Sequence, residues 1–403
     1  MNLTSNRRWF CAVMLGCLIL LSFYQWDFTG SALHVDIMSD YTSMNNDVQN
    51  GMKYILLWTN PDTGPLVYWG PGQHEYVNRK CKINNCYVTA NRSLLPSTSQ
   101  FDAVVFGSMD MWKYIPGPTE RSPHQKYIFV SLESSRYYPI CDQRYDGYFN
   151  WTWTYRLDSD EPYGYITIRN ITGDIIGPKQ IMHWMEVDSM KPINERTKNK
   201  LKKKNKTAAW FVSNCKSLSK REQFVDKLQT ELDNYGLEID IFGVCEASKQ
   251  CPRSKMKECL KLIQEEYYFY LSLENSFGED YVTEKLLTAL QNYAVPIVFG
   301  GANYTRFMPD GIYLHGGKLS VSDLAKEMND IIKDRHRYYS FFKWRNHYTY
   351  HYREESPDSD DQCIMCEMLH DENLMQTKTV YTNFREWWNP PEECSYTEDT
   401  STR

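Results

Sequence analysis

The sequence has no strong excess of charge of either sign. Its 45 Lys and Arg residues stand against 51 Asp and Glu residues, which leaves a formal net charge of −6 over 403 residues. A chain with so little net charge has no global field that would attract nucleic acid, so we expect no nucleic-acid partner. The one dense basic run, ERTKNKLKKKNKT, lies at 195–207 between two stretches of strand-like pattern. We interpret it as an exposed linker between two domains.

The sequence is also poor in long apolar runs, and the first thirty residues hold the one that approaches the length of a membrane span. It extends over 9–24 and follows Arg7 and Arg8. Its length is near the lower limit for a transmembrane helix, and the flanking Arg pair predicts a cytoplasmic N-terminus. Trp26 lies where interfacial aromatic residues are common. We therefore expect an uncleaved anchor and a luminal body. The alternative is a signal peptide cleaved near the small residues at 30–32.

A second Cys-X-X-Cys pair is missing. Cys363 and Cys366, with His370, form a conceivable zinc half-site, but a structural zinc site needs four ligands. We therefore favour a tight disulfide between Cys363 and Cys366. Ten of the twelve cysteines follow the expected anchor, and an even number in an oxidising lumen predicts disulfides whose pairing is undetermined. Five Asn-X-Ser/Thr sequences predict glycosylation of a luminal body: Asn91, Asn150, Asn170, Asn205 and Asn303.

Short apolar runs of strand length are the main secondary-structure signal. Before the basic run we predict strands at 52–59, 101–107 and 126–134. After it, predicted strands alternate with helices in the order strand 207–214, helix 218–235, strand 237–243, helix 253–266, strand 267–275, helix 281–293, strand 295–300 and helix 320–333. This alternation predicts an α/β fold with a parallel, doubly wound sheet, which binds ligands outside the carboxyl ends of its strands.

One predicted helix carries polar residues where a ligand would bind. On a helix that begins with Asp280 as N-cap, the apolar residues at 282, 286, 289, 290 and 293 form a core-facing stripe. Tyr281, Glu284 and Lys285 are spaced i, i+3 and i+4, so they share the opposite face. A solvated helix face with an ordinary Glu–Lys pair is the plain alternative for each residue taken singly.

The same stretch brings further polar groups to the end of the preceding strand. Glu274 and Asn275 follow that strand directly, and Ser213, Asn214 and Arg221 hold the corresponding place one unit earlier. A helix N-terminus there offers free N–H groups to an anion, and the cationic side chains add formal charge. The sequence therefore predicts a site for a phosphate-containing ligand.

The order of these motifs resembles a known enzyme family. The blocks SLENS, DYVTEKL and VPIV at 272–298 resemble the signature of the α1,3-fucosyltransferases, which are inverting enzymes that use GDP-fucose. FVSNC with a following Arg, SLES, and YRLDSDEPYGY at 155–165 are similar to further blocks of that family. The resemblance covers about residues 52–370. It implies a GT-B architecture, in which two Rossmann-like domains face each other across a cleft.

The resemblance also implies a role for each block. Glu133 would be the base that activates the acceptor. GDP-fucose would be bound by Arg221, Asn275, Tyr281, Glu284 and Lys285, with Ser213, Asn214 and Glu274 beside them. Because Lys285, Arg221 and helix N-termini can stabilise charge on the leaving GDP, no metal would be required, with stimulation by Mn²⁺ left open.

The expected organisation follows from the anchor, the linker and the resemblance. The chain would be a single-pass type II protein of the Golgi membrane, with its catalytic domain luminal and a glycoprotein or glycolipid glycan as acceptor. The expected parts are a cytoplasmic tail at 1–8, an anchor at 9–26, a stem at 27–50, an acceptor-side domain at 51–194, a linker at 195–206, a GDP-fucose-binding domain at 207–370 and a C-terminal tail at 371–403.

Three alternatives remain at this point. Where many members of the family carry a His-rich acceptor motif, this chain has Gly107-Ser-Met-Asp110, so the acceptor could be the core GlcNAc of an N-glycan or a terminal GlcNAc. Asp158-Ser-Asp160 and Asp358-Ser-Asp360 match the DxD pattern of metal-dependent glycosyltransferases. A non-catalytic glycan-binding membrane protein could retain the same fold.

Overall fold

The computed structural model describes residues 51–245, 249, 251–390 and 394. The expected cytoplasmic tail, anchor and stem at 1–50 lie outside these residues. Within the described ranges, no helix is both long and apolar enough to span a bilayer.

The first sheet contains six parallel strands in the order β2-β1-β3-β4-β5-β6. Their bounds are β1 Lys53–Leu57, β2 Cys86–Thr89, β3 Ala103–Gly107, β4 Lys126–Ser131, β5 Trp151–Thr154 and β6 Glu161–Pro162. The strands predicted at 52–59, 101–107 and 126–134 are confirmed as β1, β3 and β4. Every residue of β3 and β4 is buried, as expected of a parallel sheet that is covered on both faces.

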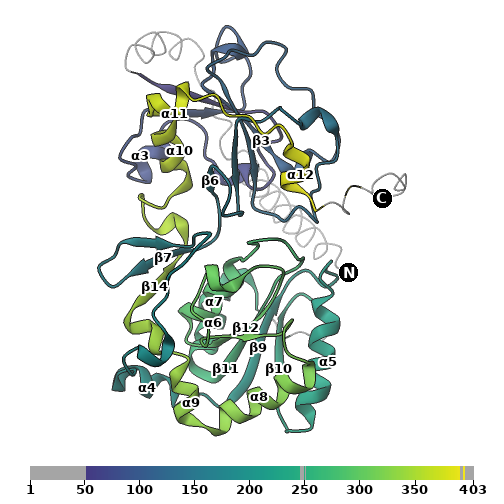
Figure 1. The fold of residues 1–403 in the computed structure, drawn as a ribbon, viewed down its shortest axis with the longest axis vertical. Coiled ribbons are helices and arrows are strands. Elements are labelled where there is room, and N and C mark those ends of the chain that lie inside the picture. The colour runs from purple at the N-terminus through teal and green to yellow at the C-terminus, as the bar shows by residue number, and fades with distance from the viewer. Residues whose placement is uncertain (1–50, 246–248, 250, 391–393, 395–403) are drawn as a thin grey trace, which may run out of the picture. The chain divides into compact units, whose positions relative to one another are not determined.

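The second sheet contains five parallel strands in the order β10-β9-β11-β12-β13. These strands are β9 Lys206–Val212, β10 Ile239–Gly243, β11 Tyr267–Leu273, β12 Val295–Phe299 and β13 Leu314–His315. The helices between and after them are α5 Arg221–Asp233, α6 Met256–Glu266, α7 Glu284–Gln291 and α8 Val321–Lys333, followed by α9 Arg335–Ser340. The predicted alternation and the α/β class are therefore confirmed (Figure 1).

A small antiparallel sheet lies beside these two and was not predicted (Figure 1). It pairs β7 Thr167–Asn170 with β8 Ile175–Gly177 and with β14 Tyr348–His351, which is distant in sequence. Its inner side shares one apolar cluster with α7 through Ile168, Tyr350, Leu286 and Leu290.

The C-terminal helices return to the first sheet (Figure 1). They are α10 Asp361–His370, α11 Glu372–Gln376 and α12 Phe384–Trp388, and α10 lies near α3 His74–Asn78. Leu369 of α10 belongs to the same apolar cluster as Ile55 of β1. Trp388 of α12 stacks edge-on against Phe129 of β4, with 4.9 Å between ring centroids. Residues 361–388 thus pack with the first sheet, which differs from the domain end expected at 370 and the tail expected after it.

Disulfides hold α10 in this position. Cys363 pairs with Cys81 and Cys366 pairs with Cys86, so the predicted Cys363–Cys366 bridge is wrong. The reason is tertiary: α10 presents both sulfurs to the segment around β2. Three further bridges join Cys141 to Cys394, Cys215 to Cys245 and Cys251 to Cys259.

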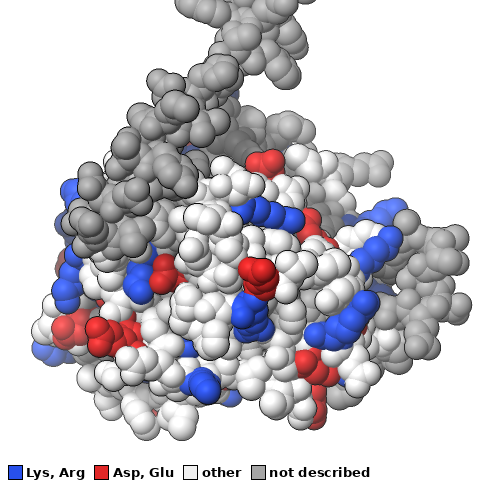
Figure 2. Space-filling model, turned by 90° about the horizontal axis from the view of Figure 1, so that it is seen from above, with Lys and Arg blue, Asp and Glu red and all other residues white. Residues whose placement is uncertain are grey.

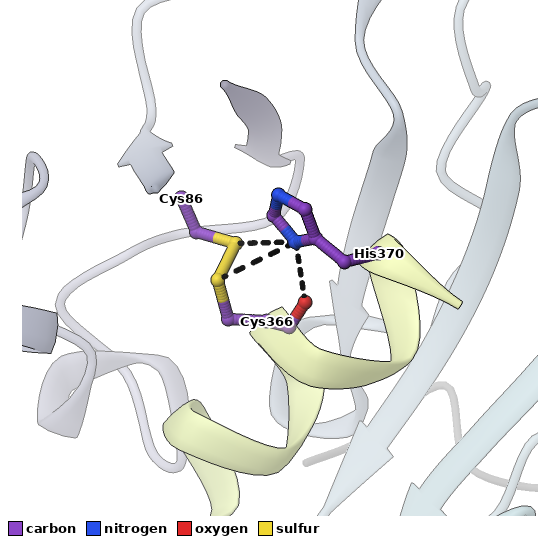
Figure 3. Close-up of side chains that lie close together, drawn as sticks. All are labelled: Cys86, Cys366 and His370. Atoms are coloured by element: carbon purple, nitrogen blue, oxygen red, sulfur yellow. Dashed lines mark hydrogen bonds between the residues drawn. A yellow bond between two sulfur atoms is a disulfide. The ribbon is translucent and has the colours of Figure 1, made fainter. Parts of the chain in front are cut away.

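The conceivable zinc half-site is explained by the same bridges. Figure 3 shows Cys86 and Cys366 joined through their sulfurs, with the His370 ring beside them. The Nδ1 atom of His370 lies 2.8 Å from the carbonyl oxygen of Cys366, a contact in which the ring nitrogen donates. Because both sulfurs are used in a disulfide, this cluster has no thiolate to offer to a metal.

The basic run is not an exposed linker throughout. Residues Glu195–Leu201 form α4, and Lys206 already belongs to β9. Lys204 is buried, and its ammonium donates to the carbonyl oxygens of Ile263 and Tyr267 at 3.1 and 2.6 Å. The end of the run is therefore part of the packing between α6 and β11. On the face seen in Figure 2, basic and acidic side chains are interspersed and no continuous basic patch is visible.

The predicted glycosylation sites differ in their surroundings. Asn91, Asn205 and Asn303 are exposed, and Asn170 is half-buried at the end of β7. Asn150 departs from the expectation of an accessible acceptor. Its amide nitrogen donates to the carbonyl oxygen of Thr379 at 2.8 Å, and its amide oxygen accepts from the backbone N–H of Tyr127 at 2.8 Å. A glycan on that nitrogen would displace the segment that precedes α12.

Candidate functional site

The second sheet places Glu274 directly after the carboxyl end of β11. Its side chain is 1% exposed. The carboxylate accepts from the backbone N–H of Thr283 at 2.9 Å and from the Thr283 hydroxyl, and it lies 3.2 Å from the ammonium of Lys285. A buried carboxylate needs such partners, because an unpaired buried charge is strongly destabilising. Glu274 is therefore built into the turn that starts α7.

The helix itself begins later than predicted. It covers Glu284–Gln291, and its N-cap is Thr283, so the predicted start at 281 with Asp280 as N-cap is wrong. Asp280 has a left-handed backbone with φ +58°. Its carboxylate accepts from the backbone N–H of Leu157 at 3.1 Å and from Arg306 at 2.6 Å. These distant partners hold Asp280 outside the helix.

Tyr281 consequently does not share a helical face with Glu284 and Lys285. Its side chain is 1% exposed and packs edge-on against Tyr155 at 4.9 Å between ring centroids. Its hydroxyl donates to Oε2 of Glu133 at 2.9 Å. The tyrosine that was expected beside the phosphate-type ligand therefore contacts the carboxylate expected to be the base.

Lys285 is a cation near this strand end and is shared by two carboxylates. Its ammonium lies 3.2 Å from Glu274 and 3.1 Å from Glu284. Burial lowers the pKa of Lys285, but the two carboxylates outweigh that effect and raise it above its ordinary value. Burial raises the pKa of Glu274, and Lys285 offsets only part of that increase. The Glu284 side chain is half-exposed; its partial burial would raise its pKa, but Lys285 holds that pKa below its usual range. Lys285 is thus charged at neutral pH.

Arg221, the first residue of α5, is almost fully buried at 3% exposure. Its guanidinium donates to the carbonyl oxygen of Leu273 at 2.7 Å and to that of Asn214 at 3.2 Å. It therefore ties the end of β11 to the loop after β9. This tie brings Asn214 and Glu274 to one edge of the second sheet.

The remaining polar residues lie along the same edge. Ser213 is exposed, and the amide nitrogen of Asn214 donates to the hydroxyl of Tyr137 at 3.0 Å. The side-chain oxygen of Asn275 accepts from the hydroxyl of Ser276 at 3.3 Å. The structure thus gathers all the sequence-predicted residues of the second sheet at the carboxyl ends of β9 and β11, with Tyr281 turned towards the first sheet.

Glu133 lies just beyond the carboxyl end of β4 in the first sheet. The Ser131 hydroxyl donates to the carbonyl oxygen of Glu133 at 2.8 Å, and the Tyr165 hydroxyl donates to that of Leu132 at 2.8 Å. With Tyr281 on its carboxylate, the backbone and the side chain of Glu133 are both positioned. A carboxylate held in this way at the end of a parallel strand is suited to accept a proton.

Glu133 and Glu284 line one pocket of about 510 Å³ between the two sheets. This volume lies within the range of roughly 300–1,000 Å³ that is usual for small-molecule sites. The wall opposite the sheet ends comes from two distant segments, which include Tyr68 and Trp69 on one side and Tyr352, Glu354 and Gln362 on the other.

The wall residues of this pocket were not found by sequence reasoning. Tyr68 and Gln362 belong to segments without a recognisable motif, and nothing local in the chain places them together. The disulfides of α10 hold these two segments close together, and their pairing could not be deduced from the sequence.

The two DxD sequences are occupied by structural contacts. Arg156 lies 2.8 Å from Asp158, and the Tyr381 hydroxyl donates to Asp160 at 2.9 Å. Arg169 donates to both carboxylate oxygens of Asp358. Asp360 caps α10 through the N–H groups of the first helical turn. The two carboxylates of each DxD sequence thus bind different partners.

Comparisons with known proteins place these features in one family. The model described as "Glycosyltransferase family 10 (fucosyltransferase) C-term" matches residues 201–387, and "Fucosyltransferase, N-terminal" matches residues 50–166. The chain is 35% identical to alpha-(1,3)-fucosyltransferase C of Drosophila melanogaster over 345 residues, which cover 83% of this chain and 77% of the relative.

Two further relatives differ in the acceptor that their names state. Glycoprotein 3-alpha-L-fucosyltransferase A of Drosophila melanogaster is 30% identical over 350 residues, which cover 85% of this chain and 62% of the relative. The 4-galactosyl-N-acetylglucosaminide 3-alpha-L-fucosyltransferase of Pongo pygmaeus is 33% identical over 335 residues, which cover 81% of each chain.

Proposed function

The chain belongs to the fucosyltransferases of glycosyltransferase family 10, and on this premise we propose that it transfers L-fucose from GDP-fucose to O3 of a GlcNAc residue, with inversion. The observation that carries the proposal is the pocket between the two sheets. This pocket is lined by Glu133, a positioned carboxylate, and by Glu284, which belongs to the polar segment that follows β11. Two parallel sheets with a site at their facing ends fit the GT-B architecture.

In this proposal Glu133 is the general base. The acceptor O3 attacks C1 of fucose, and its proton passes to the carboxylate of Glu133. The bond between C1 and the β-phosphate oxygen breaks, and GDP leaves with the electron pair. Tyr281 donates to Glu133, so its place is that of a positioning residue rather than the donor-binding residue expected from the family motif.

Charge develops on GDP as the bond breaks, and the second sheet supplies the groups to stabilise it. Lys285 is charged at the end of β11, with Asn275 and Asn214 along the same edge. Arg221 supports this edge by its two backbone contacts, and its Nε has no hydrogen-bond partner within the described residues. Glu284 extends from the edge into the pocket.

We propose that these cations make a metal dispensable, although Mn²⁺ could raise the rate. Treatment with EDTA should therefore leave a substantial part of the activity. Complete loss of activity with EDTA would contradict the proposal if Mn²⁺ restored the activity and Asp158→Ala abolished it. That outcome would favour a metal-dependent DxD mechanism.

We also propose a Golgi location, with the chain as a type II protein whose catalytic body is luminal. The support is Arg7 and Arg8 before an apolar run in the sequence, together with five disulfides in the described residues. Disulfides persist in oxidising compartments and are rare in the cytosol. Protease protection of the body in intact Golgi vesicles would test this orientation, and cleavage without detergent would contradict it.

The experiment that tests the function is transfer by the full-length chain in detergent. GDP-fucose is offered with a GlcNAc glycoside, N-acetyllactosamine and an N-glycan with its chitobiose core, and the product linkage is determined. A 1,3-linked α-fucose on any of these acceptors supports the proposal. Transfer to the chitobiose core alone would select core fucosylation of N-glycans. GDP-fucose binding without transfer to any acceptor would indicate a glycan-binding protein instead.

A further inference from the structure

The pocket extends well beyond the two carboxylates at its sheet ends. Its lining includes Glu133 and Glu284 but does not include Arg221, Asn275 or Lys285 at the donor edge. The rest of its wall is therefore on the acceptor side. That wall has three features that a single GlcNAc on Glu133 does not account for.

The first feature is an exposed aromatic ring. Tyr68 lines the pocket with 64% of its surface exposed, beside the buried Trp69 and Pro65. An exposed large aromatic side chain in a pocket wall offers an apolar surface with a polar tip. The C–H face of a pyranose ring matches such a surface.

The second feature is a buried amide without a partner. Gln362 is 3% exposed and lines the same pocket, and neither its amide oxygen nor its amide nitrogen has a hydrogen-bond partner within the described residues. Buried polar groups are nearly always hydrogen-bonded, so each exception calls for an explanation. The residue after it, Cys363, is bridged to Cys81, so α10 holds the amide in this wall. The hydroxyl or acetamido groups of a sugar would satisfy it.

The third feature is an acidic excess. Three of the lining carboxylates have a cation nearby: Asp360 has Arg79 at 2.6 Å, Asp361 has Arg353 at 2.7 Å and Glu284 has Lys285 at 3.1 Å. Two others, Glu133 and Glu354, form no ion pair with the described residues. These carboxylates would repel a negatively charged group on a ligand, because like charges repel each other.

We propose that Tyr68, Gln362 and Glu354 form a second acceptor subsite, which binds a neutral sugar linked to the reacting GlcNAc and rejects an anionic one. The proposal rests on the fucosyl transfer proposed above and specifies its substrate class. Tyr68 supplies the stacking surface and Gln362 the polar contact. Glu354 supplies the discrimination against charge.

The test compares acceptors and variants of the full-length chain by kcat/KM. The acceptors are a GlcNAc glycoside, N-acetyllactosamine and a chitobiose glycoside, so that the second sugar is either galactose or a second GlcNAc. Each disaccharide is also offered with a 6-O-sulfate on the second sugar. The wild-type chain should prefer its better disaccharide over GlcNAc by about tenfold or more.

Tyr68→Ala and Gln362→Leu should each remove most of that preference, by about tenfold, and leave kcat/KM for the GlcNAc glycoside within about twofold. The matched control for Tyr68→Ala is Tyr235→Ala, at an exposed tyrosine after α5, which should change kcat/KM for neither acceptor. The Gln362→Leu variant should keep the wild-type melting temperature, because its amide makes no hydrogen bond within the described protein. A fall in that temperature, or an equal loss on both acceptors, would overturn the assignment.

The charge element is tested with the sulfated acceptors. Sulfate should lower kcat/KM by about tenfold, which corresponds to one unit of like charge at a protein surface. Glu354→Gln should lower the ratio of kcat/KM for neutral over sulfated acceptors, whereas the control Glu372→Gln on α11 should leave that ratio unchanged. Equal use of sulfated and neutral acceptors by the wild-type chain would overturn the charge selection. Absence of transfer to every acceptor would instead refute the proposed function, and the subsite with it.

Discussion

The proposed donor edge of the second sheet, around Glu274 and Lys285, and the proposed acceptor wall of the pocket are built in opposite ways. At the donor edge, Glu274, Thr283 and Lys285 come from one stretch of twelve residues, 274–285, and satisfy one another by hydrogen bonds and an ion pair. The acceptor wall brings Tyr68 together with Gln362, and bridges with sequence separations of 282 and 280 hold these segments in place.

This difference shows how each region trades stability against binding. The donor edge is buried and internally paired, so removal of one member leaves a charge without a partner. Within the described protein, the acceptor wall contains a buried amide without a partner and two carboxylates without an ion pair, and the bridges to α10 act together with the Arg79–Asp360 pair to hold its segments. Four experiments bear on this contrast.

Removal of both bridges to α10 should have the largest effect. While Cys86–Cys366 is intact, loss of Cys81–Cys363 reopens only the short path between the bridges, so Cys81→Ala with Cys363→Ala should cost about 2–3 kcal/mol of unfolding free energy. Loss of the second bridge then opens a loop of about 80 residues, because Cys141–Cys394 still joins the two ends of the chain, and should cost about 4–5 kcal/mol more. Denaturant unfolding measures both steps.

The control for this experiment is removal of Cys251–Cys259, which closes a path of 8 residues and should resemble the first step. The acceptor KM of the single-bridge variant should rise, while GDP-fucose affinity stays near wild type. If the losses of unfolding free energy for the two bridges were simply additive, α10 would be held by its packing. Weaker GDP-fucose binding would show that α10 serves the donor edge.

Glu133→Gln should have the next largest effect, because the amide keeps the shape of the side chain but cannot take up the acceptor proton. Turnover should fall by about 10²–10⁴-fold. Binding of GDP-fucose, measured by calorimetry, should be unchanged, and the control Glu372→Gln should be fully active. A variant that keeps more than about a tenth of the wild-type rate would remove Glu133 as the base.

Lys285→Ala should destabilise the donor edge, because Glu274 would be left buried without its cation. The expected loss is about 3 kcal/mol of unfolding free energy. Glu274→Gln in the same chain should recover part of that loss, whereas Lys326→Ala, which breaks an exposed pair with Asp330, should cost less than about 0.5 kcal/mol. If Lys285→Ala kept full stability but lost GDP-fucose binding, the ion pair would be dispensable for the fold.

The smallest effect is expected at Asp358, whose pair with Arg169 links the loop after β14 to β7. The Arg169 guanidinium lowers the pKa of Asp358 to about 2. The pair therefore contributes stability above the unfolded pKa of about 3.9, and the contribution is lost as pH falls towards 2. Because Asp358 is 56% exposed, we expect less than about 1 kcal/mol.

Asp358→Asn should accordingly flatten the pH dependence of stability between about pH 4 and 2 and leave transfer within about twofold. The comparison is Asp142→Asn, at a half-buried carboxylate whose pKa Arg144 lowers to about 2. Loss of transfer in Asp358→Asn would revive a catalytic role for this DxD sequence.

The amino-acid pattern predicted much of the framework. The strand–helix alternation of the second sheet and three strands of the first were readable, because apolar runs and amphipathic stretches of the right length are local signals. The strands β2, β5, β6 and β13 and the three-stranded sheet were missed. Their pairing, such as that of β7 with β14, depends on contacts between residues far apart in the chain.

The chain order likewise determined which residue types stand at the ends of β4, β9 and β11, since residues that follow a strand must lie at its edge of the sheet. It did not determine what those residues contact. Tyr281 fits a helical face by its spacing, yet its hydroxyl reaches Glu133 in the first sheet, because Asp280 is drawn out of the helix by Leu157 and Arg306. Long-range partners of this kind outweigh the small free energy of local helix propensity, so the pairing of side chains across the pocket was settled by tertiary packing and by the bridges to α10.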